Sequence, residues 1–253
     1  MSPKNSAFFK GNDGKTTGQI NKSMTTPSHQ IPVALEIGKK RTFASALDWS
    51  GWTRSGRDEV EALDALLVYG PRYQRAISSA RLSFHAPTDL SAFKVTERLT
   101  GNTTTDFGAP DIAPSVDSEP VGAAALKRLE TVLDACWQAF SEAVESASGK
   151  QLRKGPRGGG RNVERIVDHV IESHYSYLGM IYWREPHETV PDISIMITAI
   201  KQADAQALAF ATSDEMPKTG PHGGALWMPR YFVRRAAWHI LDHAWEIEDK
   251  LEP

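Results

Sequence analysis

The chain has 253 residues, of which 40% are hydrophobic and 24% are charged, as is usual for a globular protein. Its 29 basic and 31 acidic residues nearly cancel, so it lacks the basic excess that is typical of nucleic-acid-binding proteins. Its single cysteine, Cys136, excludes an internal disulfide and a multi-cysteine metal cluster.

The first 30 residues are mainly Ser, Thr, Asn, Gly and Lys, with few large apolar side chains. Such a segment buries too little apolar surface to offset its ordering entropy, so residues 1–30 are predicted to be a disordered tail. Lys10, Lys15 and Lys22 interrupt the apolar core that a signal peptide would need. No apolar run reaches the roughly 18 residues of a membrane span. We therefore expect a cytoplasmic protein that does not contact a membrane.

Residues 31–101 are predicted to form a small α+β domain. Two short segments with roughly alternating polarity flank a turn that contains Gly38, a pattern that indicates a β-hairpin. Asp58 is placed to cap a helix, and a further alternating segment follows that helix. The expected elements in chain order are strands at 33–37 and 41–47, a short strand within 48–56, a helix from about 59, and a strand at 93–99.

A linker is predicted at residues 102–119, where Pro, Asp, Ser and Gly recur. From residue 120 onward, apolar residues follow helical spacing. Short to moderate connections between the helices favour a four-helix bundle over residues 120–253, so the fold class is α+β overall. The expected helices span about 122–147, 162–183, 193–212 and 229–250.

Two histidines in the last predicted helix form a candidate metal-binding pair. His239 and His243 are four residues apart, so on a helix they lie on one face, one turn apart. Two ligands in this arrangement can reach one metal ion. Both histidines lie beside the apolar stripe that contains Ile240, Ala244 and Ile247, and therefore at the edge of the bundle interior.

The second predicted helix of the bundle offers two candidates for a third ligand. His169 lies at the margin of its apolar stripe, as the pair does on the last helix, and we favour it for this reason. His174 lies at the centre of the stripe, where it is either an inert core histidine, the third ligand or a proton carrier beside the metal. Three imidazoles with a vacant position for water are typical of a catalytic metal site.

Nearby carboxylates could orient the imidazoles from outside the ligand set. Asp168, Glu172, Asp242 and Glu246 are the candidates, although each also fits a solvated helix face.

The helix around His169, paired with a final His-x-x-x-His helix, resembles the DinB-like family, including its YfiT-type members, over residues 120–253. That resemblance implies a four-helix bundle in which three histidines from two helices, here His169, His239 and His243, hold a divalent metal. It also implies the activity of a metal-dependent hydrolase or of a thiol-dependent transferase that uses a low-molecular-weight thiol. Zinc, nickel and iron all suit imidazole ligands.

The order of elements in residues 31–99 resembles the HicB-like family, whose small domain has a β-β-β-α-β order. No DNA-binding segment accompanies it, so an antitoxin role does not carry over. Trp49, Trp52, Arg54 and Arg57 either shape a pocket against the bundle, or the tryptophans simply pack the interface.

A basic, Gly-rich segment precedes the second helix of the bundle. Its cations Lys154, Arg157 and Arg161, together with backbone amides at the helix start, could bind a carboxylate or phosphate. A flexible basic loop is the alternative interpretation.

Three functional hypotheses follow from these patterns. The first is a metal-dependent hydrolase or thiol-dependent transferase, and the second is a non-catalytic metal-binding, ligand-binding or interaction protein. In the third, the histidines are structural and bind no metal. The expected partners are a small-molecule substrate and, in a homodimer, a second copy of the chain, with no nucleic acid and no membrane.

Overall fold

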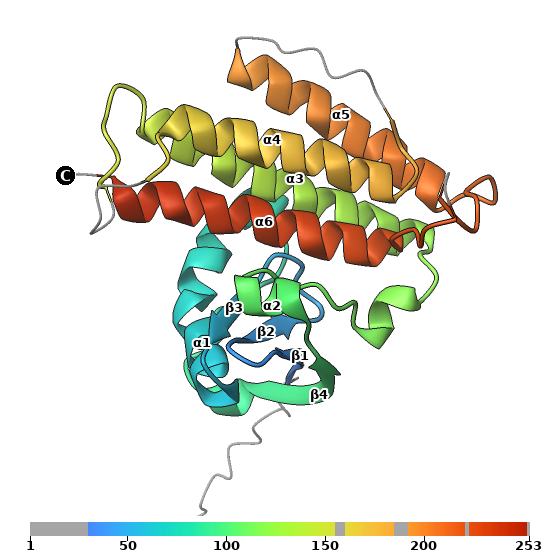
Figure 1. Ribbon diagram of the computed structural model, residues 1–253, viewed down its shortest axis with the longest axis horizontal. Coiled ribbons are helices and arrows are strands. Elements are labelled where there is room, and N and C mark those ends of the chain that lie inside the picture. Colours follow the sequence, from blue (N-terminus) through green and yellow to red (C-terminus); the bar gives the residue numbers. More distant parts are fainter. Residues whose placement is uncertain (1–29, 155–159, 185–191, 221–222, 252–253) are drawn as a thin grey trace, which may run out of the picture.

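The computed structural model describes residues 30–154, 160–184, 192–220 and 223–251. The predicted disordered tail, except Gln30, and the predicted anion-binding residue Arg157 lie outside these ranges. The described residues form a small four-stranded sheet followed by a helical region, which confirms the α+β class (Figure 1).

The N-terminal part of the structure follows the expected β-β-β-α-β order. The sheet order is β3-β2-β1-β4, in which β1 pairs antiparallel with β2 and parallel with β4. The side chain of Asp58 accepts a hydrogen bond from the backbone amide of Glu61 at the start of the helix. The elements are β1 (Ile31–Ile37), β2 (Thr42–Ala46), β3 (Thr53–Gly56), α1 (Glu59–Ala76) and β4 (Phe93–Thr100).

The two central strands of this sheet, β1 and β2, are buried on both faces. On the face that packs against α1, the Trp52 ring stacks on Tyr73 with ring centroids 5.7 Å apart, and its indole nitrogen donates to the Leu66 carbonyl oxygen. On the opposite face, Phe43 meets Trp238 of the helical region edge-to-face at 6.1 Å. Trp52 therefore belongs to the core of the N-terminal unit, not to its interface with the helices.

The helical region consists of α3 (Ala123–Ser146), α4 (Val163–Met180), α5 (Ile193–Ala211) and α6 (Pro229–Lys250). In Figure 1, α6 lies between the other long helices and the N-terminal unit, which explains why most of its residues are buried. None of the helices in the described part of the chain is both long and apolar enough to cross a membrane.

The segment predicted as a linker contains a short helix, α2 (Thr103–Phe107), that the sequence interpretation missed. Asn102 and Thr105 cap it reciprocally. The buried Glu36 carboxylate accepts hydrogen bonds from the Asp111 and Ile112 backbone amides, at 2.9–3.1 Å. Burial raises the pKa of Glu36, although these bonds and one from Thr105 act in the opposite direction. The segment is thus held against the sheet.

Charged contacts join the N-terminal unit to α6. Arg54 pairs with Asp242 at 2.8 Å, and Arg72 pairs with both Glu248 and Asp249. Arg57, in contrast, pairs with Glu61 within the N-terminal unit and is exposed.

The connection between β2 and β3 approaches the backbone of α6 so closely that it requires glycine. Gly51 has a φ of 92°, and a Cβ atom there would lie 3.1 Å from side-chain carbons of both Ala237 and Leu241. Gly51→Ala should lower the free energy of unfolding by about 1–3 kcal/mol, because it adds backbone strain to crowding. Urea unfolding measures this loss.

Gly179 in α4 supplies the matched control, because a Cβ atom there meets nothing within 4 Å. Gly179→Ala should stabilise the protein by about 0.5–1 kcal/mol through helix propensity. Equal effects of the two substitutions would contradict the proposed close contact at Gly51.

Candidate metal centre

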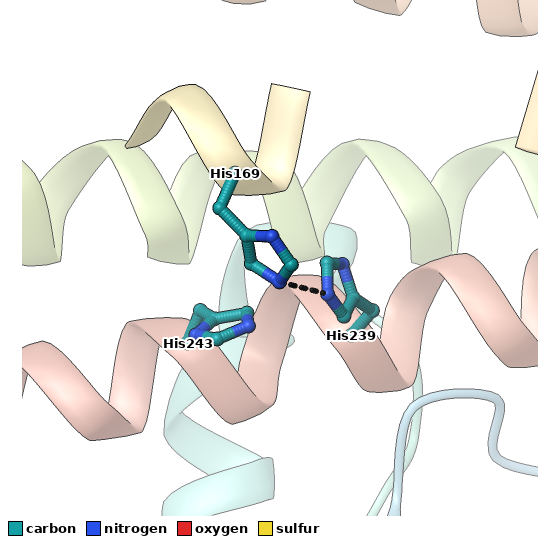
Figure 2. A group of neighbouring side chains, drawn as sticks. All are labelled: His169, His239 and His243. Carbon is teal, nitrogen blue, oxygen red and sulfur yellow. Dashed lines mark hydrogen bonds between the residues drawn. The ribbon is translucent and has the colours of Figure 1, made fainter. Parts of the chain in front are cut away.

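Three histidines from two helices converge on one point of the bundle. His169 of α4 faces His239 and His243 of α6, and their candidate ligand atoms all lie within 4.8 Å of one another. Figure 2 shows the three rings turned toward a common space, with the Nε2 atoms of His169 and His239 3.3 Å apart. The ring centroids are separated by 4.7–5.1 Å.

In the histidine trio, defined as His169, His239 and His243, the two imidazoles of α6 are largely shielded from water and His169 is half-buried. His239 is 7% exposed and His243 is 9% exposed. The rings of Tyr177 and Trp238 pack beside His239, with centroids 5.7 and 6.0 Å away. In such surroundings an imidazole loses hydration that would stabilise its charged form.

This environment keeps two of the imidazoles neutral. Burial lowers the pKa of His239 to about 2, and the neighbouring His243 acts in the same direction. Burial also lowers the pKa of His169, with a further contribution from the positive charge of Arg161. Only the neutral imidazole has a lone pair to offer, so this electrostatic environment suits the binding of a metal cation.

A carboxylate orients the third imidazole. Glu246 Oε2 lies 2.7 Å from His243 Nδ1. Hydrogen bonds from His243 and Lys250 lower the pKa of Glu246 to about 2, so this side chain is an ionised acceptor. When His243 Nδ1 donates to it, Nε2 is the ring nitrogen left to face a metal ion. The donor set therefore fits a divalent metal held by three imidazole nitrogens.

The other predicted orienting carboxylates lie elsewhere. Asp242 forms its ion pair with Arg54, on the side of α6 that faces the N-terminal unit. Asp168 is exposed and lines a surface cleft that does not include the histidine trio. Within the described residues, Glu246 is thus the one predicted carboxylate bonded to a member of the trio.

His174 belongs to a separate buried polar group. It is 1% exposed, and its Nε2 lies 2.6 Å from Asp204 of α5. Asp204 also accepts a hydrogen bond from the Trp137 indole at 2.9 Å. His174 is buried because it lies at the centre of the apolar stripe of α4, which points into the bundle core. The partner Asp204 was missed, although it is the single carboxylate in a mostly apolar helix, which was a signal for it.

Two of the predicted anion-binding cations line a cleft of about 870 Å³ near the start of α4. Lys154 and Arg161 are both exposed there, and the described lining of the cleft contains none of the three histidines. The cleft is therefore separate from the candidate metal centre.

Glu246→Gln should weaken zinc binding about 10- to 100-fold, because the neutral amide no longer fixes the tautomer and orientation of His243. Competition against a chromogenic chelator measures this change. Asp168→Asn is the matched control, because it removes a carboxylate next to His169 that touches none of the rings, and it should leave affinity unchanged. Equal losses in the two variants would contradict an orienting role for Glu246.

Comparison with known proteins gives one match. The family model of the DinB superfamily matches residues 132–247, which include most of α3 and all of α4 and α5. The match includes all three histidines and ends within α6. The search of curated proteins and the search of solved structures each found nothing that matches the chain.

Proposed function

We propose that this chain, whose residues 132–247 match the DinB superfamily, binds a divalent metal ion through His169, His239 and His243. The observation that carries the proposal is the convergence of three imidazole groups from two helices to within 4.8 Å. Convergence by itself is also seen in buried polar clusters. Here it is combined with low pKa values and with an orienting carboxylate, as at metal sites with imidazole ligands.

The proposed ion is zinc, nickel or iron, all of which accept imidazole ligands. Three protein ligands leave a tetrahedral ion one position for water or substrate. When bound, such an ion supplies Lewis acidity and lowers the pKa of a coordinated water or thiol. The chain itself holds the ligands in place, since Glu246 orients His243 and the aromatic rings of Tyr177 and Trp238 restrict His239.

The activity we propose is that of a metal-dependent hydrolase or a thiol-dependent transferase acting on a small molecule. Both reactions use a nucleophile, water or a low-molecular-weight thiol, that a metal activates near neutral pH. The β-β-β-α-β order supports a HicB-like origin for the N-terminal unit, whose role here is to cover α6. We also propose that the protein is cytoplasmic and forms a homodimer.

Metal-dependent turnover tests this function. Zinc-, nickel- and iron(II)-loaded protein should hydrolyse a member of an ester and amide panel, or transfer a thiol to an electrophile, and chelation should abolish this activity. Stoichiometric metal binding without turnover of any substrate would favour the non-catalytic alternative. Activity that survives chelation would contradict the proposal.

A further inference from the structure

A cavity of about 700 Å³ lies where the N-terminal unit meets α3 and α6. Pockets that bind small molecules usually have volumes of roughly 300–1,000 Å³, and they often lie between structural units. The described lining contains none of the three histidines, so this cavity is separate from the candidate metal centre. Its large apolar lining residues, apart from Trp49, are Ile31, Leu47, Phe84, Val116, Leu129 and Val132.

Trp49 forms an aromatic wall of the cavity. Its ring meets Phe84 edge-to-face, with centroids 4.7 Å apart, and the Arg128 guanidinium lies 4.5 Å from its centroid. Trp49 is half-buried, whereas Trp52 is fully buried in the core and is not among the described lining residues. Contacts on both sides hold the Trp49 ring in place while part of it stays accessible. The ring therefore offers a fixed aromatic surface to an apolar ligand.

Two arginines give the cavity positively charged groups. Arg128 of α3 and Arg230 of α6 both line it. Arg128 donates to the Asp48 carbonyl oxygen, and Arg230 donates to those of Glu119 and Pro120. These bonds fix the side chains but do not neutralise them, and each guanidinium has more N–H donors than the bonds use. Both arginines can therefore donate to a ligand in the cavity.

The other charged side chains of the described lining leave a positive excess. Arg234 is paired with the buried Asp117, so these two charges balance. One further carboxylate, that of Asp48, stands against Arg128 and Arg230. Apolar walls with an excess of one positive charge are complementary to a monoanion that has an apolar body.

Residues 1–29 complement the cavity less well than such an anion does. Gln30 lines the cavity, so the chain that precedes it is within reach. That chain carries four lysines and one carboxylate, and its net charge therefore has the same sign as that of the lining. Like charges disfavour its binding there.

We propose that this cavity binds a small aromatic carboxylate, with its ring against Trp49 and its carboxylate on Arg128 and Arg230. A planar guanidinium matches the geometry of a carboxylate and can hold it with two parallel hydrogen bonds. Binding at this cavity does not depend on the proposed function, because the ligand and the metal would occupy different sites.

Calorimetric titration of the metal-free, full-length protein with 2-naphthoate tests the proposal. Without metal, the carboxylate cannot bind at the histidine trio through an ion. We expect a Kd below about 1 mM. The neutral analogue 2-naphthalenemethanol should bind at least about tenfold more weakly, because it lacks the charge-assisted hydrogen bonds. No heat of binding at millimolar naphthoate, or equal affinity for the two compounds, would overturn the proposal.

Filling the cavity locates the binding site. Ala125 of α3 lines the cavity and is half-buried, so Ala125→Trp should weaken naphthoate binding at least about 30-fold by occupying its space. Ala124→Trp is the matched control, because Ala124 is exposed on the same helix and is not among the described lining residues. It should bind naphthoate as the wild type does. Wild-type affinity in Ala125→Trp, or equal losses in the two variants, would place the ligand elsewhere.

Removing the positive charges tests the recognition of the carboxylate, and it decides the question if Ala125→Trp fails to fold. Arg128→Met and Arg230→Met should each weaken naphthoate about fivefold or more, because each loses a charge-assisted contact. Arg75→Met is the control, since Arg75 of α1 pairs with Glu248 and its side chain is 66% exposed. Equal affinities in the three variants would contradict a role for the two lining arginines.

A further variant distinguishes the proposed ligand from residues 1–29. Phe8→Ser combined with Phe9→Ser removes the largest apolar side chains of that segment, and it should leave naphthoate affinity unchanged. Tighter binding in this variant would show that the segment itself occupies the cavity, which would overturn the proposal. The titrations need no metal, so failure to bind zinc would count against the proposed function alone.

Discussion

Replacing His239 by alanine is expected to weaken zinc binding by at least about 100-fold, which exceeds the effect of losing an orienting group. His239 is the most buried member of the trio, and its Nε2 lies 3.3 Å from that of His169. The substitution removes one of the three ligands. The two that remain are too few for a metal site with three protein ligands and one open position. Competition with a chromogenic chelator at fixed pH measures the loss.

His85→Ala is the matched control, because His85 is exposed, lies in the N-terminal unit and is not one of the three converging imidazoles. It should bind zinc as the wild type does. The helical circular dichroism of His239→Ala should stay close to that of the wild type, since an apolar side chain replaces a neutral buried ring. Wild-type zinc affinity in His239→Ala would remove this residue from the ligand set.

Asp117→Ala is expected to cause the largest loss of stability, about 3–5 kcal/mol in the free energy of unfolding. Asp117 is 1% exposed, and it accepts two hydrogen bonds, of 2.7 and 2.8 Å, from the buried Arg234 guanidinium. Truncation would leave that cation buried without a counter-charge. Because Arg234 also holds the carbonyl oxygens of Ala46 and Leu47, the junction between sheet and bundle would be affected. Urea unfolding measures the effect.

Asp134→Ala provides the comparison, because Asp134 pairs with Lys201 on the surface, where the aspartate side chain is 61% exposed. It should cost less than about 1 kcal/mol. Arg234→Met combined with Asp117→Leu should recover much of the lost stability, because apolar residues replace both buried charges. Similar losses for Asp117→Ala and Asp134→Ala would contradict the structural importance of the buried pair.

The fold was predictable to the extent that it depends on local patterns. Apolar periodicity and the cap residue Asp58 located the long helices close to their observed bounds. The strand order and the parallel pairing of β1 with β4 depend on packing between distant segments. The helix at Thr103–Phe107 was missed because it is short and lacks an apolar periodicity of its own.

For the candidate site too, local spacing predicted one part, and the other part depends on packing between distant segments. Spacing on one helix was enough to place His239 and His243 on one face. The choice between His169 and His174 required knowledge of how α4 packs against α6, and the structure brings His169 to the pair. The partner of Asp242 could not be predicted from the sequence, because Arg54 lies 188 residues away.

X-ray absorption spectroscopy of the zinc-loaded wild-type protein tests the central proposal most directly. We expect about one equivalent of zinc, bound by three imidazole nitrogens at about 2.0–2.1 Å together with one oxygen ligand. Less than about 0.2 equivalents after metal-rich expression, or a coordination shell with fewer than two imidazoles, would contradict a metal centre at His169, His239 and His243.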